Sequence, residues 1–299
     1  MSYEFSVDVC ATSANLGACF DFAGIPVNGF YNTVLANRSS DSLTSITIEG
    51  HGMGTLPTNE QNLVYKAFKR VFEAKELDCP AMHIHCINRI PPNSGMGSSA
   101  AAALGGIFLA NEVLGNTLTK EFMLEIACEF EGHPDNAAPV IYNSAVITAE
   151  VDSKRIVKQI QLKKDLYLAI AVPDIKMPTY LSRSVLPDSY SRGELVKAMY
   201  CSTFIIDCLK DGDYELMAKM MMQDIVHIPY RKALITGYDD VVDAAMANGA
   251  YGCMISGAGS TMVSFCADEE TAKCVSDAMV KAFEKNDVSA VGVTSVVRA

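Results

Sequence analysis

The stretch PPNSGMGSSAAAA at 91–103 is the feature that most constrains the fold of this chain. It joins an apolar segment with strand character to an alanine-rich segment with helical character. Gly95 and Gly97 allow the backbone to approach a ligand without a Cβ in the way, and Ser98 and Ser99 can offer hydroxyls to oxygen atoms or a metal. A helix that begins there points free N–H groups and the positive end of its dipole at the same place. The stretch therefore predicts an anion-binding turn between a strand and a helix.

Glycine-rich turns of this kind have other uses. Some serve only the close packing of a strand on a helix, and this interpretation stays open for the stretch taken alone. A P-loop has a Lys-Ser/Thr pair after its second glycine, where this chain has Ser98 and Ser99. A dinucleotide fingerprint has an acid at the end of the next strand about 20 residues later, whereas Glu112 falls inside the predicted helix. The sequence therefore argues against a P-loop and against an NAD site.

Composition narrows the ligand and the compartment. The 299 residues suggest one or two domains, and a hydrophobic content of 49% is sufficient for sizeable cores. A formal charge of -11 argues against nucleic-acid binding, and no apolar run approaches the roughly 18 residues of a membrane span. The ten cysteines include no CxxC pair, and the first ten residues lack the basic and apolar regions of a signal peptide. We therefore expect a cytoplasmic protein with a small-molecule ligand, and neither nucleic acid nor membrane as a partner.

The first half of the chain alternates between strand and helix patterns. A Thr58-to-Gln61 capping box predicts the start of the first helix, and Thr119 and Gly132 predict the two ends of the third. Strands are predicted near 3–10, 44–49, 82–90 and 144–151, and helices near 61–76, 98–113 and 120–131. These elements make up a predicted N-terminal domain over residues 1–160.

A charged segment at 152–165 contains most of a hairpin-like crossing and marks the predicted boundary. In the second predicted domain, 161–299, a Ser191-to-Glu194 capping box opens the first helix, and a glycine turn joins two strands. The predicted strands are 166–173, two within 251–266, and 289–297, and the predicted helices are 192–210, 213–223, 238–248 and 269–285. This β-α-α-α-β-β-α-β order suits an antiparallel sheet with helices on one side.

Four separate segments resemble one family. They are ATSANLGACFDFAG at 11–24, PPNSGMGSSAAAA at 91–103, EGHPDNAAPVIYN at 131–143 and MISGAGSTMVSF at 254–265. In order and spacing they are similar to the homoserine kinases of the GHMP kinase superfamily. The resemblance implies an α/β fold of the α+β type with two domains, the first resembling domain 2 of ribosomal protein S5 and the second ferredoxin-like. It also implies that ATP and Mg²⁺ bind mainly at the 91–103 loop, and that a homodimer forms.

The resemblance assigns the phosphate and metal ligands within these segments. Magnesium needs hard oxygen ligands, for which one serine hydroxyl, Ser98 or Ser99, and one carboxylate suffice. The resemblance favours Glu131 as that carboxylate and leaves Glu129 as the alternative; a position on a solvated helix face stays open for both, and more so for Glu129. The residues expected to bind ATP are Pro91, Pro92, Asn93, Ser94, Gly95, Met96, Gly97, Ser98, Ser99, Ala100 and Ala101.

An amino-acid acceptor needs partners for a carboxylate, an ammonium and a hydroxyl. Arg183 and Arg231 match family positions that hold the carboxylate, and a guanidinium binds a carboxylate with two hydrogen bonds. Asp21 and Asn15 match positions for the ammonium and hydroxyl ends, with Asn136 on the other side as a catalytic and substrate-binding residue. A turn or helix cap remains the alternative for Asp21, and a surface position the alternative for the arginines.

The sequence does not identify the general base. Asp135 lies where the mevalonate branch of the superfamily has a catalytic aspartate, although homoserine kinases are often described as working without a dedicated base. His133, beside a proline, is the weaker candidate. The resemblance implies transfer of a phosphoryl group from ATP to the side-chain hydroxyl of L-homoserine, a step toward threonine. The alternatives are a GHMP kinase with another small acceptor such as shikimate, or a nucleotide-binding sensor without turnover.

Overall fold

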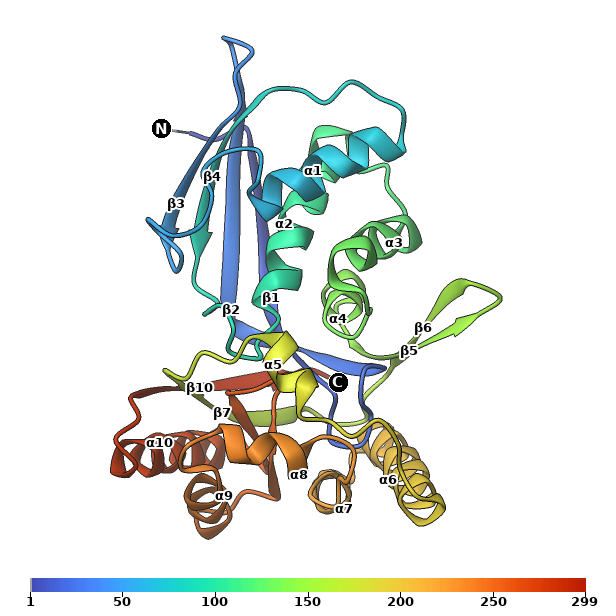
Figure 1. The fold of residues 1–299 in the computed structure, drawn as a ribbon, viewed down its shortest axis with the longest axis vertical. Helices are drawn as coiled ribbons and strands as arrows, with labels where there is room; N and C mark the ends of the chain where they lie inside the picture. Colours follow the sequence, from blue (N-terminus) through green and yellow to red (C-terminus); the bar gives the residue numbers. More distant parts are fainter. Residues whose placement is uncertain (1) are drawn as a thin grey trace.

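The computed structural model describes residues 2–299, and its two halves are each built on one sheet (Figure 1). The first sheet has the order β3-β4-β2-β5-β6, with β1 paired to β2, and only β3 and β4 run parallel. Its strands are β1 (Phe5–Ala14), β2 (Ala23–Arg38), β3 (Ser45–Gly50), β4 (Met82–Asn88), β5 (Ala145–Val151) and β6 (Lys154–Ile160). The predicted strands are confirmed, but the sequence prediction lacked the long central strand β2.

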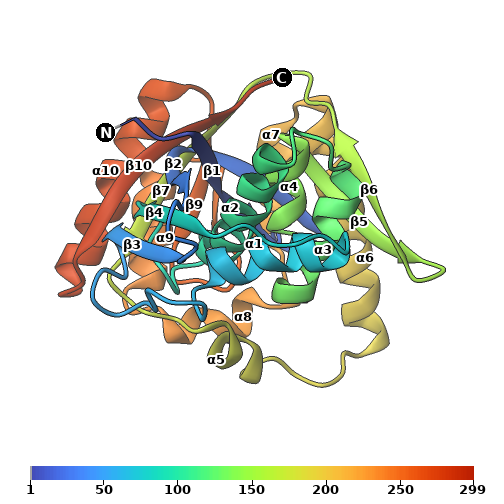
Figure 2. The same cartoon turned by 90° about the horizontal axis from the view of Figure 1, so that it is seen from above.

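Four helices pack on this sheet. They are α1 (Leu63–Ala74), α2 (Ser98–Val113), α3 (Lys120–Glu131) and α4 (Ala137–Tyr142), and α2 lies between the strands and the outer pair α1 and α3 (Figure 2). The predicted ends of α3 are confirmed, because Thr119 Oγ1 accepts from the Phe122 N–H and Gly132 has a φ of 82°. The predicted capping box of α1 is wrong, since the Asn62 side chain caps that helix by accepting from the Val64 N–H at 2.9 Å.

The second sheet is antiparallel and has the order β10-β7-β9-β8. Its strands are β7 (Leu166–Pro173), β8 (Gly252–Ile255), β9 (Met262–Cys266) and β10 (Ala290–Val297). The helices are α5 (Thr179–Ser184), α6 (Arg192–Asp211), α7 (Tyr214–Met221), α8 (Ile228–Arg231), α9 (Tyr238–Ala247) and α10 (Glu269–Lys285). Helices α6, α7, α9 and α10 lie on the side of this sheet away from the first sheet (Figure 1), which confirms the predicted layers, while short α5 and α8 were not predicted.

Loops from both halves meet between the two sheets and are joined by backbone hydrogen bonds. The Thr261 N–H donates to the Ser94 carbonyl at 2.9 Å, and the Met177 N–H donates to the Asn93 carbonyl at 2.8 Å. The Gly257 N–H donates to the Ala14 carbonyl at 3.1 Å. These bonds hold the glycine-rich loop against the turn between β8 and β9. Within residues 2–299, no helix has the length and apolar character needed to cross a membrane.

Candidate active site

A cavity of about 290 Å³ lies where these loops meet, and residues from all four family-like segments line it. Most of the residues predicted for the site line this cavity: Asn15, Asp21, Asn93, Ser94, Gly95, Gly97, Ser98, Ser99, Glu131, Asp135, Asn136, Arg183 and Arg231. Six predicted residues do not line it: Pro91, Pro92, Met96, Ala100, Ala101 and Glu129. Because Met96, Ala100 and Ala101 have buried side chains, they can reach a ligand there only through backbone groups.

The glycine-rich loop leaves the start of α2 open to an anion. Gly97 precedes the helix in the left-handed region with φ of 68°, and no side chain caps the first-turn N–H groups. A Cβ at Gly97 would collide with the hydroxyl of Thr12, and a Cβ at Gly95 would collide with the carbonyl of Ser256. Both positions therefore require glycine, which gives the loop its shape and keeps the helix N–H groups accessible to phosphate oxygens.

A hydroxyl and a carboxylate meet beside this helix start. Ser99 Oγ donates to Glu131 Oε1 at 2.5 Å, joining the first turn of α2 to the last residue of α3. Burial raises the pKa of Glu131, an effect that the Ser99 hydrogen bond and the nearby His133 only partly oppose. Glu129, in contrast, makes two hydrogen bonds to Arg70 at 2.6 and 2.9 Å. The pair Ser99 and Glu131 is thus the oxygen donor set that fits a divalent cation, whereas Ser98 Oγ donates to the Ile90 carbonyl at 3.2 Å.

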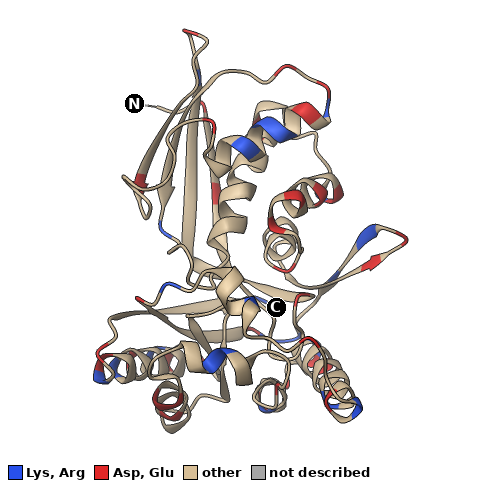
Figure 3. Cartoon of the chain, viewed as in Figure 1, with Lys and Arg blue, Asp and Glu red and all other residues tan. Residues whose placement is uncertain are grey.

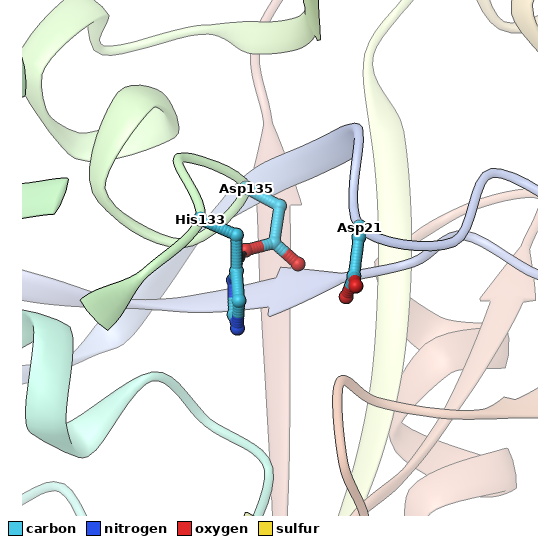
Figure 4. Close-up of side chains that lie close together, drawn as sticks. All are labelled: Asp21, His133 and Asp135. Atoms are coloured by element: carbon cyan, nitrogen blue, oxygen red, sulfur yellow. Dashed lines mark hydrogen bonds and ion pairs between the residues drawn. The ribbon is translucent and has the colours of Figure 1, made fainter. Parts of the chain in front are cut away.

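Two carboxylates and a histidine gather in the same cavity. Ligand atoms of Asp21, His133 and Asp135 all lie within 4.8 Å of one another. Figure 4 shows Asp135 between the other two, with one carboxylate oxygen turned toward the histidine. That oxygen, Oδ1, pairs with His133 Nδ1 and raises the pKa of the imidazole, while Oδ2 has no hydrogen-bond partner within residues 2–299. The cluster offers negative charge to a small cation or a hydroxyl group.

The two arginines differ in their surroundings. Arg183, on α5, donates to both oxygens of Asp21, at 2.8 and 3.0 Å. The residue predicted to bind the acceptor carboxylate and the residue predicted to bind the acceptor ammonium therefore neutralise each other's charge. Arg231 is 1% exposed, and burial lowers its pKa to about 10. Its Nε and Nη1 donate to the carbonyls of Ser182 and Gly257, and Nη2 has no hydrogen-bond partner among the described residues. One face of the Arg231 guanidinium thus remains for a ligand.

The amide groups of the site hold its walls together. Asn15 Nδ2 donates to the Gly257 carbonyl at 2.8 Å, and Asn15 Oδ1 accepts from the Asp21 N–H at 3.0 Å. Asn15 has a φ of 78° and Asp21 a φ of 63°, so the loop carries strained backbone at both residues. Asn15 therefore supports the geometry of Asp21 in addition to lining the cavity.

Several residues were missing from the sequence prediction: Phe130, Met177 and Thr179 line the cavity, and Thr12 and Phe20 contact side chains that line it. Thr12 Oγ1 donates to Asn136 Oδ1 at 2.8 Å, and Thr179 lines the cavity one helical turn before Arg183. The Phe20 ring lies 5.5 Å from Arg183 Cζ and 5.1 Å from Arg231 Cζ, close enough for cation–π contacts. Thr12 and Phe20 belong to the segment that carries Asn15 and Asp21, and Thr179 is four residues from Arg183, so these spacings were the available signal.

Comparison with known proteins agrees with this geometry. The family model described as the GHMP kinases N terminal domain matches residues 62–144, and the model described as GHMP kinases C terminal matches residues 205–285. A homoserine kinase of Parasynechococcus marenigrum is 37% identical over 95% of this chain and 90% of its own. A homoserine kinase of Desulfitobacterium hafniense is 34% identical over 95% and 94%.

Solved structures of kinases are also similar to this chain. The crystal structure of a homoserine kinase from Cytophaga hutchinsonii has a TM-score of 0.91 and 30% identity, over 100% of this chain and 96% of that one. The crystal structure of a mevalonate kinase from L. major has a TM-score of 0.72 at 15% identity, over 98% of this chain and 96% of that one, and this likeness shows the fold alone.

The two sheets with a glycine-rich loop between them, together with the two matched family models, define a GHMP kinase. The predicted α/β two-domain fold is therefore confirmed. Within that class the chain belongs to the homoserine kinase family, and it is an ATP-using kinase.

Proposed function

We propose that this chain transfers the terminal phosphoryl group of ATP to the side-chain hydroxyl of L-homoserine, giving ADP and O-phospho-L-homoserine on the route to threonine. The observation that carries the proposal is the cluster of Asp21, Arg183 and Arg231 in the same cavity as the phosphate loop. The names of the relatives at 34 to 37% identity support the same acceptor. A sugar acceptor would leave the buried Arg231 without an anionic partner.

The charges of the cavity fit a zwitterion. The α-carboxylate of the acceptor would bind Arg231, whose Nη2 is free, and Arg183, whose guanidinium can exchange Asp21 for the substrate carboxylate. The α-ammonium would then replace Arg183 as the cationic partner of Asp21. Binding would replace the pair of Arg183 with Asp21 by a pair of Asp21 with the ammonium and by a carboxylate shared between two guanidinium groups, and it selects acceptors that carry both an ammonium and a carboxylate.

The opposite end of the cavity fits the phosphates of ATP. The uncapped N–H groups at the start of α2 would receive phosphate oxygens, and Ser99 with Glu131 would hold Mg²⁺. A half-buried carboxylate whose pKa is raised by burial fits a metal ligand, because a bound cation would restore its charged form. When bound, Mg²⁺ would neutralise charge on the transferred group.

The acceptor hydroxyl would lie between these two ends, near Asn136 and Asp135. Asn136 is oriented by Thr12, and Asp135 is 2% exposed with Oδ2 available to accept the hydroxyl proton. We keep Asp135 as the candidate base and His133 as the group that holds its carboxylate in place. Phosphoryl transfer depends mainly on alignment and charge neutralisation, so a base would add to a rate that positioning already provides.

The remaining predictions concern the whole protein. The division into domains 1–160 and 161–299, the homodimer and the cytoplasmic location are proposals that accompany this function. They rest on the family resemblance and on composition.

Release of ADP from Mg²⁺-ATP tests the proposal directly. The purified full-length chain is offered L-homoserine, D-homoserine, L-threonine, shikimate, mevalonate and galactose in parallel. We expect strong turnover with L-homoserine alone. Turnover with shikimate, mevalonate or galactose instead would contradict the amino-acid site, turnover with D-homoserine or L-threonine instead would contradict L-homoserine as the acceptor, and ATP binding without turnover in any reaction would identify a sensor.

A further inference from the structure

His227 lies at the boundary of the site and takes no part in the assignments above. It is 0% exposed, and it directly precedes α8, the short helix that carries Arg231. Its Nε2 lies 3.2 Å from the Gly17 carbonyl oxygen, and its Nδ1 lies 3.3 Å from Arg231 Nη1. A carbonyl can only accept and a guanidinium can only donate, so the ring is neutral with its proton on Nε2.

This one ring therefore connects two parts of the acceptor site. On one side it donates to the loop that contains Asn15 and Asp21, and on the other it accepts from Arg231. The Phe20 ring, which lies near both site arginines, is 5.5 Å from the imidazole. Helix α8 has only four residues, so its own hydrogen bonds cannot fix the direction of Arg231.

Asp224 fixes the backbone on which the histidine is placed. Its carboxylate accepts from the N–H groups of Val226, His227 and Ile228, at 2.8, 3.0 and 2.8 Å. With the backbone held in this way, the imidazole has a defined position between Gly17 and Arg231. A residue that filled the same space without both hydrogen-bonding atoms would leave a buried carbonyl or a buried guanidinium nitrogen unpaired.

From this geometry we infer that His227 is a positioning residue for the acceptor site: it sets Arg231 and the Asp21 loop at the separation that an amino-acid zwitterion requires. The inference rests on the proposed function. It predicts that loss of His227 affects acceptor binding and leaves ATP binding unchanged, because the phosphate loop touches neither of its partners.

The test compares His227→Phe and His227→Gln with the wild type, measuring the KM for L-homoserine, the KM for ATP and the Tm. The Phe variant removes both hydrogen bonds, and we expect its L-homoserine KM to rise about 10- to 100-fold, as for the loss of a buried hydrogen bond, with the ATP KM within about twofold. The Gln variant retains one amide donor and one acceptor, so its KM for L-homoserine should lie between those of the wild type and the Phe variant. If the Phe variant does not fold, the KM values of the Gln variant alone test the inference.

Met217→Ala is the matched control, because Met217 is fully buried in α7 of the same half of the chain and does not line the cavity. If His227 had only a structural role, its variants would behave like Met217→Ala, with a lower Tm and an unchanged KM for L-homoserine. That result would overturn the inference. A wild-type protein without L-homoserine turnover would instead overturn the proposed function.

Discussion

Arg183 and Asp21 form a two-bond ion pair across the acceptor end of the cavity, with N–O distances of 2.8 and 3.0 Å. The residues are 162 positions apart and come from different halves of the molecule. Each side chain is about one third exposed, so solvent screens the pair and its contribution to stability is small. The pair is better understood as two halves of a binding site that neutralise each other until a zwitterion separates them.

Asp21→Asn tests this interpretation. The amide keeps the shape of the side chain but loses the charge that would hold the α-ammonium, so we expect the KM for L-homoserine to rise by about tenfold or more. The KM for ATP should stay within about twofold. Asp211→Asn, which alters a remote exposed pair with Lys163, serves as the control. Equal increases in both KM values would contradict a role limited to the acceptor.

Arg231→Ala addresses the carboxylate end. Because Arg231 is buried and has one free nitrogen, its loss should raise the L-homoserine KM far more than the KM for ATP. Arg231→Lys keeps the charge without the planar pair of donors and should recover only part of the affinity. Steady-state kinetics with each substrate varied in turn gives the comparison. If the two KM values rise together, Arg231 does not bind the acceptor carboxylate.

The metal ligand is tested by two neighbouring glutamates. Glu131→Gln should raise the Mg²⁺ concentration needed for half-maximal activity by about tenfold or more, because an amide is a weaker ligand than a carboxylate. Glu129→Gln only breaks the pair with Arg70 and should leave that concentration unchanged. Titration of activity with Mg²⁺ at fixed ATP distinguishes the two variants. The reverse order would assign the metal to Glu129.

More of the predicted site residues lie together around one cavity than the sequence analysis predicted of the sheet beneath it, because the long strand β2 was missed. β2 was missed because Pro26, Asn28 and Gly29 interrupt its pattern, and the register of β1 with β2 shifts at this place. The pairing of β2 with β1, β4 and β5, through contacts far apart in sequence, outweighs the weak local propensity. Short α5 and α8 were missed for the related reason that tertiary contacts, and no local signal, keep them helical.

The four family-like segments, which are far apart in the sequence, each contribute residues to the lining of one cavity. What they could not predict were relationships between segments, such as the pairing of Asp21 with Arg183 or the ring of Phe20 beneath two arginines. The cap of α1 shows the same limit on a small scale. Thr58 and Gln61 have the right residue types, but Asn62 is the residue whose side chain reaches a free N–H.

Asp135→Asn tests the candidate base. If Asp135 Oδ2 accepts the hydroxyl proton, we expect kcat to fall by about 10²- to 10⁴-fold, with the L-homoserine KM within about threefold. His133→Gln is the companion variant, because His133 pairs with the other oxygen of the same carboxylate and should have the smaller effect on kcat. A fall in kcat of less than about tenfold in Asp135→Asn would show that the reaction proceeds without this base.

The buried His227 makes the stability of the protein depend on pH in a defined direction. Burial is the main reason that its pKa is lowered to about 4, and the neighbouring Asp224 only partly opposes this shift. In the unfolded chain a histidine binds a proton below about pH 6.5. Between pH 6.5 and 4 the unfolded state therefore binds more protons than the native state, and the free energy of unfolding falls as the pH falls, by up to about 3 kcal/mol.

Urea unfolding of the wild type and of His227→Gln between pH 7 and pH 4 measures this contribution. Glutamine does not titrate, so the variant should start less stable at pH 7 and lose less stability on acidification than the wild type. His51→Gln, which removes an exposed histidine from a loop of the first domain, is the control and should keep the wild-type slope. If His227→Gln and the wild type lose stability in parallel, the imidazole is already protonated in the native state. In that case it cannot accept a hydrogen bond from Arg231.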